Sequence, residues 1–486
     1  MIPSPDAPSS AGEDDSRDGG LPDGPAVGMD MVAHVVLERA NFPRRRPALS
    51  LAQGRRFVAR RVPALRQSIA TALLLGLRFV QARLISVWGL LVAAYFCPPN
   101  VFAAFAVFST AATFVSLPAL LRLEAVFFRS SNRRELALAF RLALTSGVAF
   151  LALAGVVLIV IVQLGWLPPL IGLVFFLSLS ARTALRLLWS EATAEGDFRA
   201  IGNSNLVQAL VQPVAMLLLI GVFGPKALAL FAADAVGHWA ATLYLVIRRR
   251  ANLLDLVHPR LWSMRGLSWG LQHWHDAPRI LLPAAMLSFG FTAAPLLALP
   301  YADDSLLAAQ VALAMRLLDM PTQMFGTVTG PLVMRTLRSG DRRRRRFWMR
   351  AATLALAAAA IGLFLTIAFG ALTFGSVFDG SKWDGIGEVV AVMALFYAGI
   401  ALFNPVHDIT TLSRNTTWQL ASHGIALIAI IAAILWFGAL SHELLYALGA
   451  ISVARAVTHV LFVWIARDDP QDSAASGFSG MRAAAP

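Results

Sequence analysis

Apolar residues occupy most of the chain in long runs, which are separated by short polar stretches. A helix needs about 20 mostly apolar residues to cross the hydrocarbon core of a bilayer, because each residue adds about 1.5 Å. When the chain is divided at its arginine clusters and its Pro, Gly and Asp turns, twelve runs reach this length. The pattern predicts twelve membrane-spanning helices, near residues 67–96, 101–127, 136–163, 168–192, 203–222, 227–247, 277–299, 305–333, 348–375, 386–412, 417–438 and 443–466.

The composition supports a protein whose solvent is lipid. Apolar and aromatic residues make up 57% of the chain, charged residues make up only 14%, and the mean hydropathy is +0.66. Soluble domains carry about 25% charged residues, so this chain has too little polar surface to fold alone in water. We therefore predict an all-α polytopic membrane protein with about twelve transmembrane helices.

Polar segments divide the chain. The N-terminal segment is rich in Pro, Gly, Ser and Asp and has no apolar run, which is typical of disorder, and no signal-peptide pattern opens the chain. The basic stretch that follows, 46–66, is predicted to lie on anionic lipid headgroups. The basic loop 248–276, which contains several Trp residues, is predicted to form a helix in the membrane interface. The predicted segments are a disordered cytoplasmic tail (1–45), a basic interfacial arm (46–66), an N-terminal six-helix bundle (67–247), a cytoplasmic basic interfacial linker (248–276), a C-terminal six-helix bundle (277–466) and a second disordered cytoplasmic tail (467–486).

The basic residues predict the orientation in the membrane. Arginine clusters fall in alternate loops, for example at Arg248 to Arg250 and at Arg342 to Arg346, whereas the other loops contain only Lys226 and Lys382 as basic residues. Loops rich in Arg and Lys stay in the cytoplasm, which places both termini there. An even number of spans requires the same placement. The net charge of +13 therefore belongs to loops beside the membrane and does not indicate a nucleic-acid partner.

Several kinds of chemistry have little support in the sequence. The single cysteine, Cys97, excludes a disulfide framework and a thiolate metal cluster. No Gly-Lys-Ser/Thr phosphate loop occurs, and the only close histidine pair, His273 and His275, better suits headgroup-level contacts than a metal site. Ser, His and Asp never gather in a nucleophile motif. We expect neither a cofactor nor a metal, and we expect a protein that is not an enzyme.

Four helices carry an arginine deep in the predicted membrane region. At 1.5 Å per residue they lie about 18–22 Å from the nearest turn on the Arg-poor side, and such residues are costly in lipid and usually functional. We hypothesise a water-filled cavity between the two groups of helices, in which guanidinium groups bind phosphate oxygens through paired hydrogen bonds. The proposed cavity residues are Arg83, Arg182, Arg316 and Arg455.

A structural role is the alternative for the same arginines. Arg316 could pair with Asp319 one turn away on its own helix, and Arg455 could pair with Asp234 of the sixth helix. Two further residues, Arg78 and Arg186, lie nearer the cytoplasmic edge, where long side chains can reach water. They are additional site candidates. So are Asp234 and His238, which are spaced one helical turn apart and could relay protons or form a buried polar contact.

Three short motifs carry a resemblance to a known family. They are Leu-Arg-Leu-Glu-Ala-Val at 121–126 with the basic segment 129–135, the spacing of Pro295, Arg316 and Pro321, and the turn from Phe378 to Trp383. The chain resembles the Wzx-type polysaccharide flippases of the multidrug/oligosaccharidyl-lipid/polysaccharide exporter superfamily. The resemblance covers roughly residues 65–466 and departs from the family at Ala103, where glycine is usual.

This resemblance implies a structure and a cargo. Two six-helix bundles would form a V around a central cavity, in the bacterial inner membrane. The cargo would be a polyprenyl-pyrophosphate-linked oligosaccharide, moved to the outer leaflet by alternating access for exopolysaccharide, capsule or O-antigen export. Anionic membrane lipids would be partners, together with a polysaccharide polymerase and export machinery.

Two other functions compete with this interpretation. A cation-coupled exporter of drugs or other lipids has the same fold, but it would favour acidic residues deep in the first or seventh helix, and this chain has none there. A membrane polymerase or glycosyltransferase needs a substantial extracytoplasmic loop or domain. The predicted outer loops do not exceed about 15 residues, which argues against such an enzyme.

Overall fold

The computed structural model describes residues 81–465 except 83, 129, 131–132, 259–261, 300–301, 303, 339–341 and 412–415. The predicted tails and basic arm lie outside these residues, so their structure stays a prediction. Within the described part, all twelve predicted runs coincide with helical structure. Eight helices are long and apolar enough to span a membrane, and Leu84–Phe96, Ala277–Thr292 and Ala421–Phe437 are shorter apolar helices. The remaining predicted run, 305–333, is also helical, and it contains the charged residues Arg316 and Asp319.

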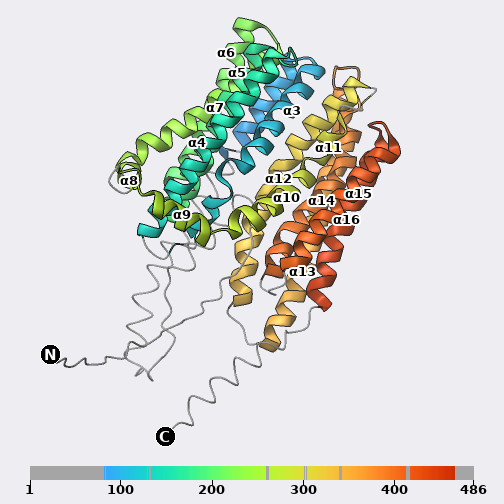
Figure 1. Cartoon of the computed structure of the whole chain (residues 1–486). Helices are drawn as coiled ribbons and strands as arrows, with labels where there is room; N and C mark the ends of the chain where they lie inside the picture. Colours follow the sequence, from blue (N-terminus) through green and yellow to red (C-terminus); the bar gives the residue numbers. More distant parts are fainter. Residues whose placement is uncertain are drawn as a thin grey trace, which may run out of the picture.

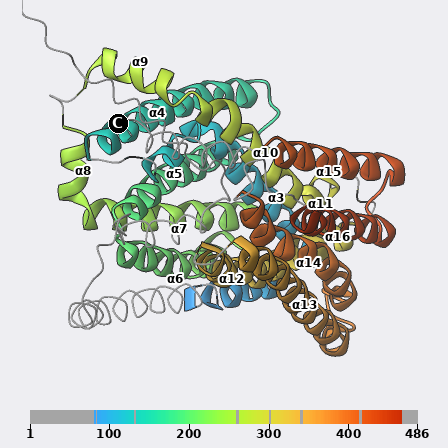
Figure 2. The same cartoon turned by 90° about the horizontal axis from the view of Figure 1, so that it is seen from below.

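Two groups of helices lie side by side, and each is formed by one half of the chain (Figure 1). The first bundle contains Leu84–Phe96, α3 (Pro99–Ser116), α4 (Arg133–Gln163), α5 (Pro169–Ala194), α6 (Phe198–Phe223) and α7 (Ala227–Arg248). The second contains α10 (Leu282–Thr292), α11 (Ala294–Leu297), α12 (Ser305–Arg338), α13 (Arg342–Gly375), α14 (Ile386–Thr411), α15 (Thr416–Phe437) and α16 (His442–Ile465). Figure 2 shows the two groups from below, with α3 and α12 where they meet.

We distinguish the two ends of the bundles by their loops. The basic end contains the links from α3 to α4, α5 to α6, α7 to α8, α12 to α13 and α14 to α15. The opposite end contains the links before α3, from α4 to α5, α6 to α7, α11 to α12, α13 to α14 and α15 to α16. The predicted linker forms two short helices beside the first bundle, α8 (Arg250–Leu256) and α9 (Met264–His273) (Figure 1). Helix α9 exposes Met264, Trp269 and Leu271, a composition that suits a membrane surface.

Two predicted helices are interrupted in the structure. The run 101–127 is not one helix, because α3 is followed by two 3-10 turns, Leu117–Leu120 and Leu123–Phe128. Between them Leu121 and Arg122 adopt φ values of 50° and 58°, which side-chain-bearing residues rarely adopt. The run 277–299 begins with a π turn, Ala277–Leu281, and then divides into α10 and α11, with prolines near the start of both helices.

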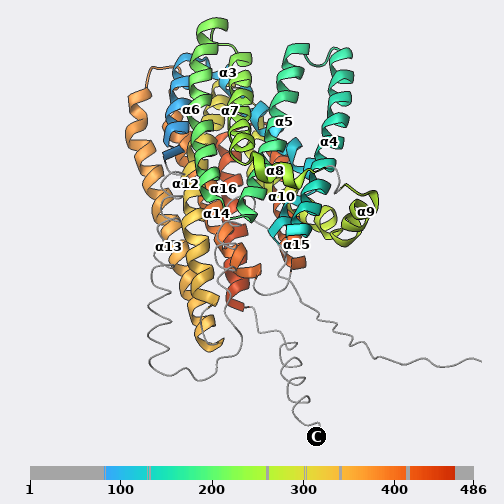
Figure 3. The same cartoon turned by 90° about the vertical axis from the view of Figure 1, so that its left-hand side faces the viewer.

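Helices α12 and α13 are also longer than the predicted runs 305–333 and 348–375, so the link between them is shorter than predicted. The two helices continue through the arginine-rich segment to Arg338 and from Arg342, and they run past α4 and α5 at the basic end (Figure 3). The reason is that hydropathy marks the edge of the lipid, whereas the backbone hydrogen bonds of a helix do not need lipid. Arginine is itself a good helix former.

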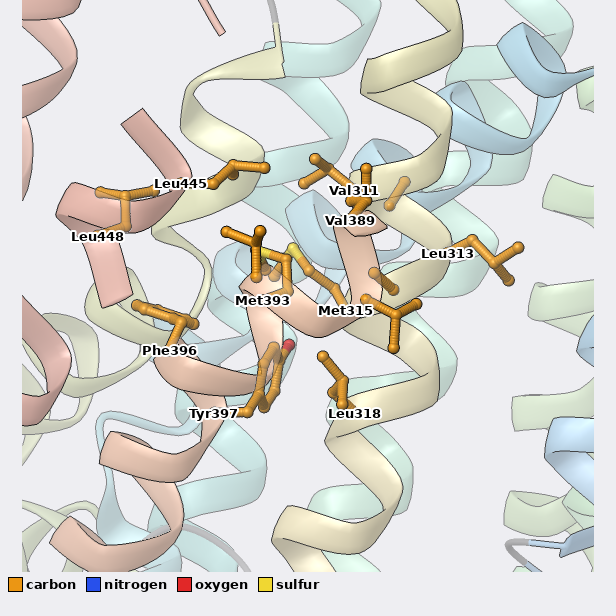
Figure 4. Close-up of a cluster of buried hydrophobic side chains, with 14 of the residues drawn as sticks. Val311, Leu313, Met315, Leu318, Val389, Met393, Phe396, Tyr397, Leu445 and Leu448 are labelled. Carbon is orange, nitrogen blue, oxygen red and sulfur yellow. The ribbon is translucent and has the colours of Figure 1, made fainter. Parts of the chain in front are cut away.

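The core of the second bundle lies where α12, α14 and α16 pack together (Figure 4). Val311 and Leu318 of α12 face Val389 and Tyr397 of α14, and Leu445 of α16 closes the cluster. Close helix approach depends on Gly399 of α14. A Cβ atom at this position would lie 2.3 Å from the Ser452 hydroxyl and 2.5 Å from the Ser452 backbone carbon of α16.

An ionic cluster, which we call the Arg249 clip, ties the basic end of the first bundle together. The Arg249 guanidinium donates to both Glu191 oxygens, at 2.7 Å and 2.6 Å, and to Asp197 at 2.9 Å. Asp197 also caps α6 by accepting from the Ala200 backbone N–H. Burial acts to lower the pKa of Arg249, but the Glu191 hydrogen bonds outweigh it and raise that pKa above its ordinary value. The clip therefore joins the ends of α5, α6 and α7.

The two bundles are joined at the opposite end by a contact that we call the Lys382–Trp383 latch. The Trp383 indole N–H donates to the Ala94 carbonyl at 3.0 Å, and its ring packs edge-on against Phe102 at 5.7 Å. Lys382 donates to the Cys97 carbonyl at 2.8 Å and to the Tyr95 carbonyl. These groups belong to the turn before α14, to the last turn of the helix Leu84–Phe96 and to the residue that follows it, so the latch connects the two bundles at the opposite end.

Candidate functional site

The predicted cavity arginines fall into two places. Arg182 of α5 and Arg316 of α12 come together where the bundles meet, because each lies within electrostatic reach of the other. Arg455 of α16 lies inside the second bundle among different neighbours. Arg83 and Arg78 lie outside the described residues, so their role stays a prediction.

Arg182 is held by a set of hydroxyl groups and one carboxylate. Its Nη2 donates to both Asp234 oxygens, at 2.9 Å and 2.7 Å, and to the Ser109 hydroxyl at 2.9 Å. Its Nη1 donates to Thr113 at 2.8 Å, and its Nε donates to Ser178 at 3.3 Å. Every nitrogen of this guanidinium therefore has a partner. The side chain is 11% exposed.

Helical spacing explains how this cluster forms. Ser178 and Arg182 are one turn apart on α5, Ser109 and Thr113 are one turn apart on α3, and α7 brings Asp234 between them. Ser178 also donates to Asp234, at 2.8 Å. A carboxylate that accepts from one guanidinium and one hydroxyl is well compensated in a buried place.

His238 lies one turn after Asp234, as predicted, and is bound in a polar contact. Its Nδ1 lies 2.8 Å from the Asp234 backbone carbonyl and 3.7 Å from the Asp234 carboxylate. Its Nε2 lies 3.1 Å from the Gln208 side-chain nitrogen. The buried polar contact that we considered for this pair is therefore present. A proton relay stays a prediction.

Arg316 is positioned differently from Arg182. Its guanidinium carbon lies 5.8 Å from the centre of the Phe105 ring of α3, across the bundle interface. Its Nη2 atom is buried and has no hydrogen-bond partner. Asp234 is within electrostatic reach. A cation at the interface thus keeps an N–H group that no oxygen of the described residues accepts.

The predicted pairing of Arg316 with Asp319 does not form as a direct ion pair among the described residues. The Asp319 carboxylate instead accepts a hydrogen bond of 2.6 Å from Gln323, one turn further along α12. Tyr397 of α14 lies within electrostatic reach of both Arg316 and Asp319. Asp319 therefore contributes to the electrostatics near Arg316 without binding its N–H groups.

The predicted pairing of Arg455 with Asp234 is wrong. Asp234 binds Arg182, whereas Arg455 lies between the rings of Phe291 and Phe403, at 4.1 Å and 3.7 Å from their centres. The prediction failed because depth along a helix does not determine which helix faces which. The sixth and twelfth helices belong to different bundles.

Arg186 has a structural contact instead of reaching toward water. Its guanidinium donates to the Ser116 and Leu117 carbonyls, at 3.1 Å and 2.8 Å, where α3 ends. It also pairs with Glu124 at 3.1 Å, and Glu124 pairs with Arg122 at 3.5 Å. Burial lowers the pKa of Arg122, an effect that Glu124 opposes and Arg186 reinforces. This cluster satisfies carbonyls that the break after α3 would leave unpaired.

Sequence reasoning missed the neutral partners of Arg182. Ser109, Thr113 and Ser178 are common residues in apolar helices, so they carry little signal individually. Their spacing of four residues, from each other or from Arg182, was the available signal. Among the described residues, no group of three His, Cys, Asp or Glu side chains could hold a metal ion.

Comparisons with known proteins identify the fold. No protein-family model matches the chain. A search of curated proteins also finds no match. Among solved structures, the lipid II flippase MurJ in an inward closed conformation is 10% identical and has a TM-score of 0.62, with 81% of this chain and 90% of that chain covered.

Two transporter structures are also similar. A variant of the Vibrio cholerae MATE transporter VcmN is 12% identical with a TM-score of 0.52, covering 81% of this chain and 97% of that chain. An inward-facing multidrug resistance MATE family transporter of the MOP superfamily is 12% identical with a TM-score of 0.51, covering 79% and 93%. The chain has the fold of MATE transporters and of the lipid II flippase MurJ.

Proposed function

We propose that the protein moves a polyprenyl-pyrophosphate-linked oligosaccharide across a membrane by alternating access of its two bundles. The fold supports membrane transport, and the similarity to a lipid II flippase supports a lipid-linked cargo. The Wzx-type motifs of the sequence support a polysaccharide precursor. Export of exopolysaccharide, capsule or O-antigen would use this step.

One observation carries the proposal, namely the unpartnered Nη2 atom of Arg316. A buried guanidinium with a free N–H costs free energy unless an acceptor binds it. The atom lies at the bundle interface, beside Phe105 of the other bundle. An anionic oxygen of the cargo would supply the missing acceptor. It would bind at the interface between the two bundles, where Arg316 and Phe105 meet.

The charges near this site favour an anionic cargo over a cationic drug. The two carboxylates within reach of Arg316 already have partners, since Asp234 binds Arg182 and Asp319 binds Gln323. A cationic substrate would need an available carboxylate. A pyrophosphate needs available guanidinium hydrogen bonds, while its polyprenyl tail can remain in lipid.

The proposal includes an orientation. With the basic end in the cytoplasm, the latch closes the side away from the cytoplasm in the described state. The cargo would then approach from the basic end, and release would follow opening of the latch. The proposed location is the bacterial inner membrane, with anionic lipids and a polysaccharide polymerase as partners.

Arg316 gives the direct test. The full-length protein is reconstituted in liposomes with a fluorescently labelled undecaprenyl-pyrophosphate-linked disaccharide, and exchange between leaflets is measured by dithionite quenching. Arg316→Gln should reduce exchange about tenfold or more, because a hydrogen bond to a charged group contributes about 1.5–3 kcal/mol. Arg316→Lys should restore part of the activity, since the ammonium keeps the charge without the planar fork.

Asp319→Asn is the matched control. The substituted amide oxygen can still accept from Gln323, so exchange should stay near the wild-type rate. Both proteins should melt near the wild-type temperature, because neither change breaks an ion pair, and Arg316→Gln removes only the long contact with the Phe105 ring. Wild-type exchange by Arg316→Gln would refute the assignment, and transport of ethidium without exchange of the lipid would favour the drug-exporter alternative.

A further inference from the structure

Arg455 occupies a second charged place, inside the second bundle and separate from the bundle interface. Its side chain is 7% exposed. Phe291 of α10 covers one side of the guanidinium and Phe403 of α14 covers another, with ring centres at 4.1 Å and 3.7 Å from its carbon. Its Nη2 group contacts Nδ1 of His423 on α15. Three neighbouring helices, α10, α14 and α15, therefore contact this cation of α16.

The charge of Arg455 is not balanced by a carboxylate in the part of the chain that the structure describes. Arg455 forms no ion pair with a carboxylate of the described residues, and its Nε atom is buried without a hydrogen-bond partner. Cation–π contacts with two phenylalanines reduce the cost of burial. They do not neutralise the charge and they do not accept the Nε–H. A buried charge normally has a counter-charge.

The geometry limits what the counter-charge can be. The two rings cover the guanidinium, His423 contacts Nη2, and Nε is buried without a hydrogen-bond partner, so Nε is the atom where a ligand would complete the hydrogen bonding. Carboxylates and phosphates bind guanidinium best through two parallel hydrogen bonds, whereas here only the Nε nitrogen is buried without a partner, and Nη2 already contacts His423. A single spherical acceptor fits the remaining N–H. One negative charge balances the one guanidinium.

The neighbouring polar groups among the described residues lie on α15 and α16. His459 follows Arg455 by one turn, its Nε2 lies 2.7 Å from the Ser422 hydroxyl, and its ring packs edge-on against Phe403 at 4.5 Å. His423 also packs edge-on against Phe403, at 5.4 Å. Among the described residues, this environment holds one fixed cation, two imidazoles and one hydroxyl, and it lacks an acidic group.

We propose that the second bundle contains a binding site for a small monovalent inorganic anion, such as chloride, at the Nε–H of Arg455. The anion would complete the hydrogen bonding of the guanidinium and neutralise the buried charge. It would thereby stabilise the packing of α10, α14, α15 and α16. The site is independent of the cargo proposed above, because Arg316 and Arg182 belong to another set of contacts.

The test measures stability against anion concentration. The purified full-length protein is melted in detergent at constant ionic strength while sodium chloride replaces sodium gluconate. The melting temperature should rise with chloride and saturate, and bromide should have the same effect. Sodium phosphate should have no such effect, because the buried Nε offers a single N–H and the Phe291 and Phe403 rings cover the guanidinium. Arg455→Gln should lose the whole chloride-dependent rise.

Arg316→Gln is the control, since a chloride effect arising at the bundle interface would disappear in this variant. Retention of the effect in Arg316→Gln and its loss in Arg455→Gln would support the site. Equal chloride responses of Arg455→Gln and wild type, or no response of wild type, would overturn it. If Arg455→Gln does not fold, wild-type crystals soaked in bromide decide the question. Anomalous density should appear within hydrogen-bond distance of Arg455 Nε, and an empty position there would refute the proposal.

Discussion

Arg182 and Arg316 have the same side chain, but their surroundings give them different roles. Arg182 is satisfied by Asp234 and three hydroxyl groups, whereas Arg316 keeps one buried N–H without an acceptor. A pair such as Arg182 and Asp234 stabilises the fold only while both partners are present, because removal of one leaves a buried charge uncompensated. Substitution of Arg182 should therefore lower stability, whereas substitution of Arg316 should lower transport.

Arg182→Met should destabilise the protein by about 3–5 kcal/mol, because Asp234 would remain buried without its cation. The double substitution Arg182→Met with Asp234→Leu should recover most of the lost stability. Thermal unfolding can be followed with a thiol-reactive dye at Cys97. Burial raises the pKa of this thiol, although Lys382 acts in the opposite direction, so it reacts mainly after unfolding. A double variant no more stable than Arg182→Met would contradict the pairing.

At this scale the sequence predicts which residues are unusual but not which residues meet. The depth of Arg182 and Arg316 followed from their distance to the predicted turns, and both do lie near each other. The partner of Asp234 did not follow, since one sequence contains no information on which helices are neighbours. The surroundings of Arg455 did not follow either, for the same reason.

Packing between α14 and α16 depends on one position without a side chain. Gly399→Ala should destabilise the second bundle by about 1–3 kcal/mol, because the added methyl group would overlap the Ser452 backbone. Gly370→Ala on α13 is the matched control, since a Cβ atom there would meet nothing within 4 Å. It should change stability by less than about 0.5 kcal/mol. Melting temperatures of both variants check this, and equal effects would show that the close approach is not limiting.

The helices themselves were predictable because lipid imposes a length and a composition on them. All twelve runs coincide with helical structure in the described part of the chain. The break after α3 was not predictable, since Leu121 and Arg122 adopt positive φ without a glycine to indicate it. Their conformation is supported by contacts with Arg186 from a distant helix, which no local pattern reveals.

For the whole molecule, the Lys382–Trp383 latch should determine how often the opposite end is closed. Lys382→Met with Trp383→Phe removes three hydrogen bonds to backbone carbonyls and keeps an aromatic ring against Phe102. At about 1 kcal/mol for each bond, the ratio of closed to open molecules should fall about tenfold or more.

Spin labels can measure this ratio. In a Cys97→Ala background, labels at the exposed positions Trp166 and Trp436 report the separation of the two bundles at the opposite end. The latch variant should gain a population at longer distance. Lys226→Met, which changes an exposed lysine of the same end, should leave the distances unchanged. An identical distribution in the latch variant and the wild type would show that these bonds do not hold the bundles closed.

The proposed orientation makes a separate prediction. A reporter fused after Arg467 should be active only as a cytoplasmic enzyme, because positive loops stay on that side. A reporter inserted at Gly438, in the link from α15 to α16, should be active only outside the cytoplasm. Alkaline phosphatase and β-galactosidase fusions at both sites measure this. The reverse pattern would invert the proposed direction of transport.

The Arg249 clip has a consequence for the biosynthesis of the protein. Its acidic partners, Glu191 and Asp197, leave the ribosome before Arg249 does, so the clip can close before the turn that carries Lys382 and Trp383 has been translated. The carbonyls of Ala94, Tyr95 and Cys97 must instead wait for residues 382 and 383. A nascent chain stalled after the first bundle should therefore already resist proteolysis at its basic end. Its opposite end should become protected only when the turn before α14 has been made.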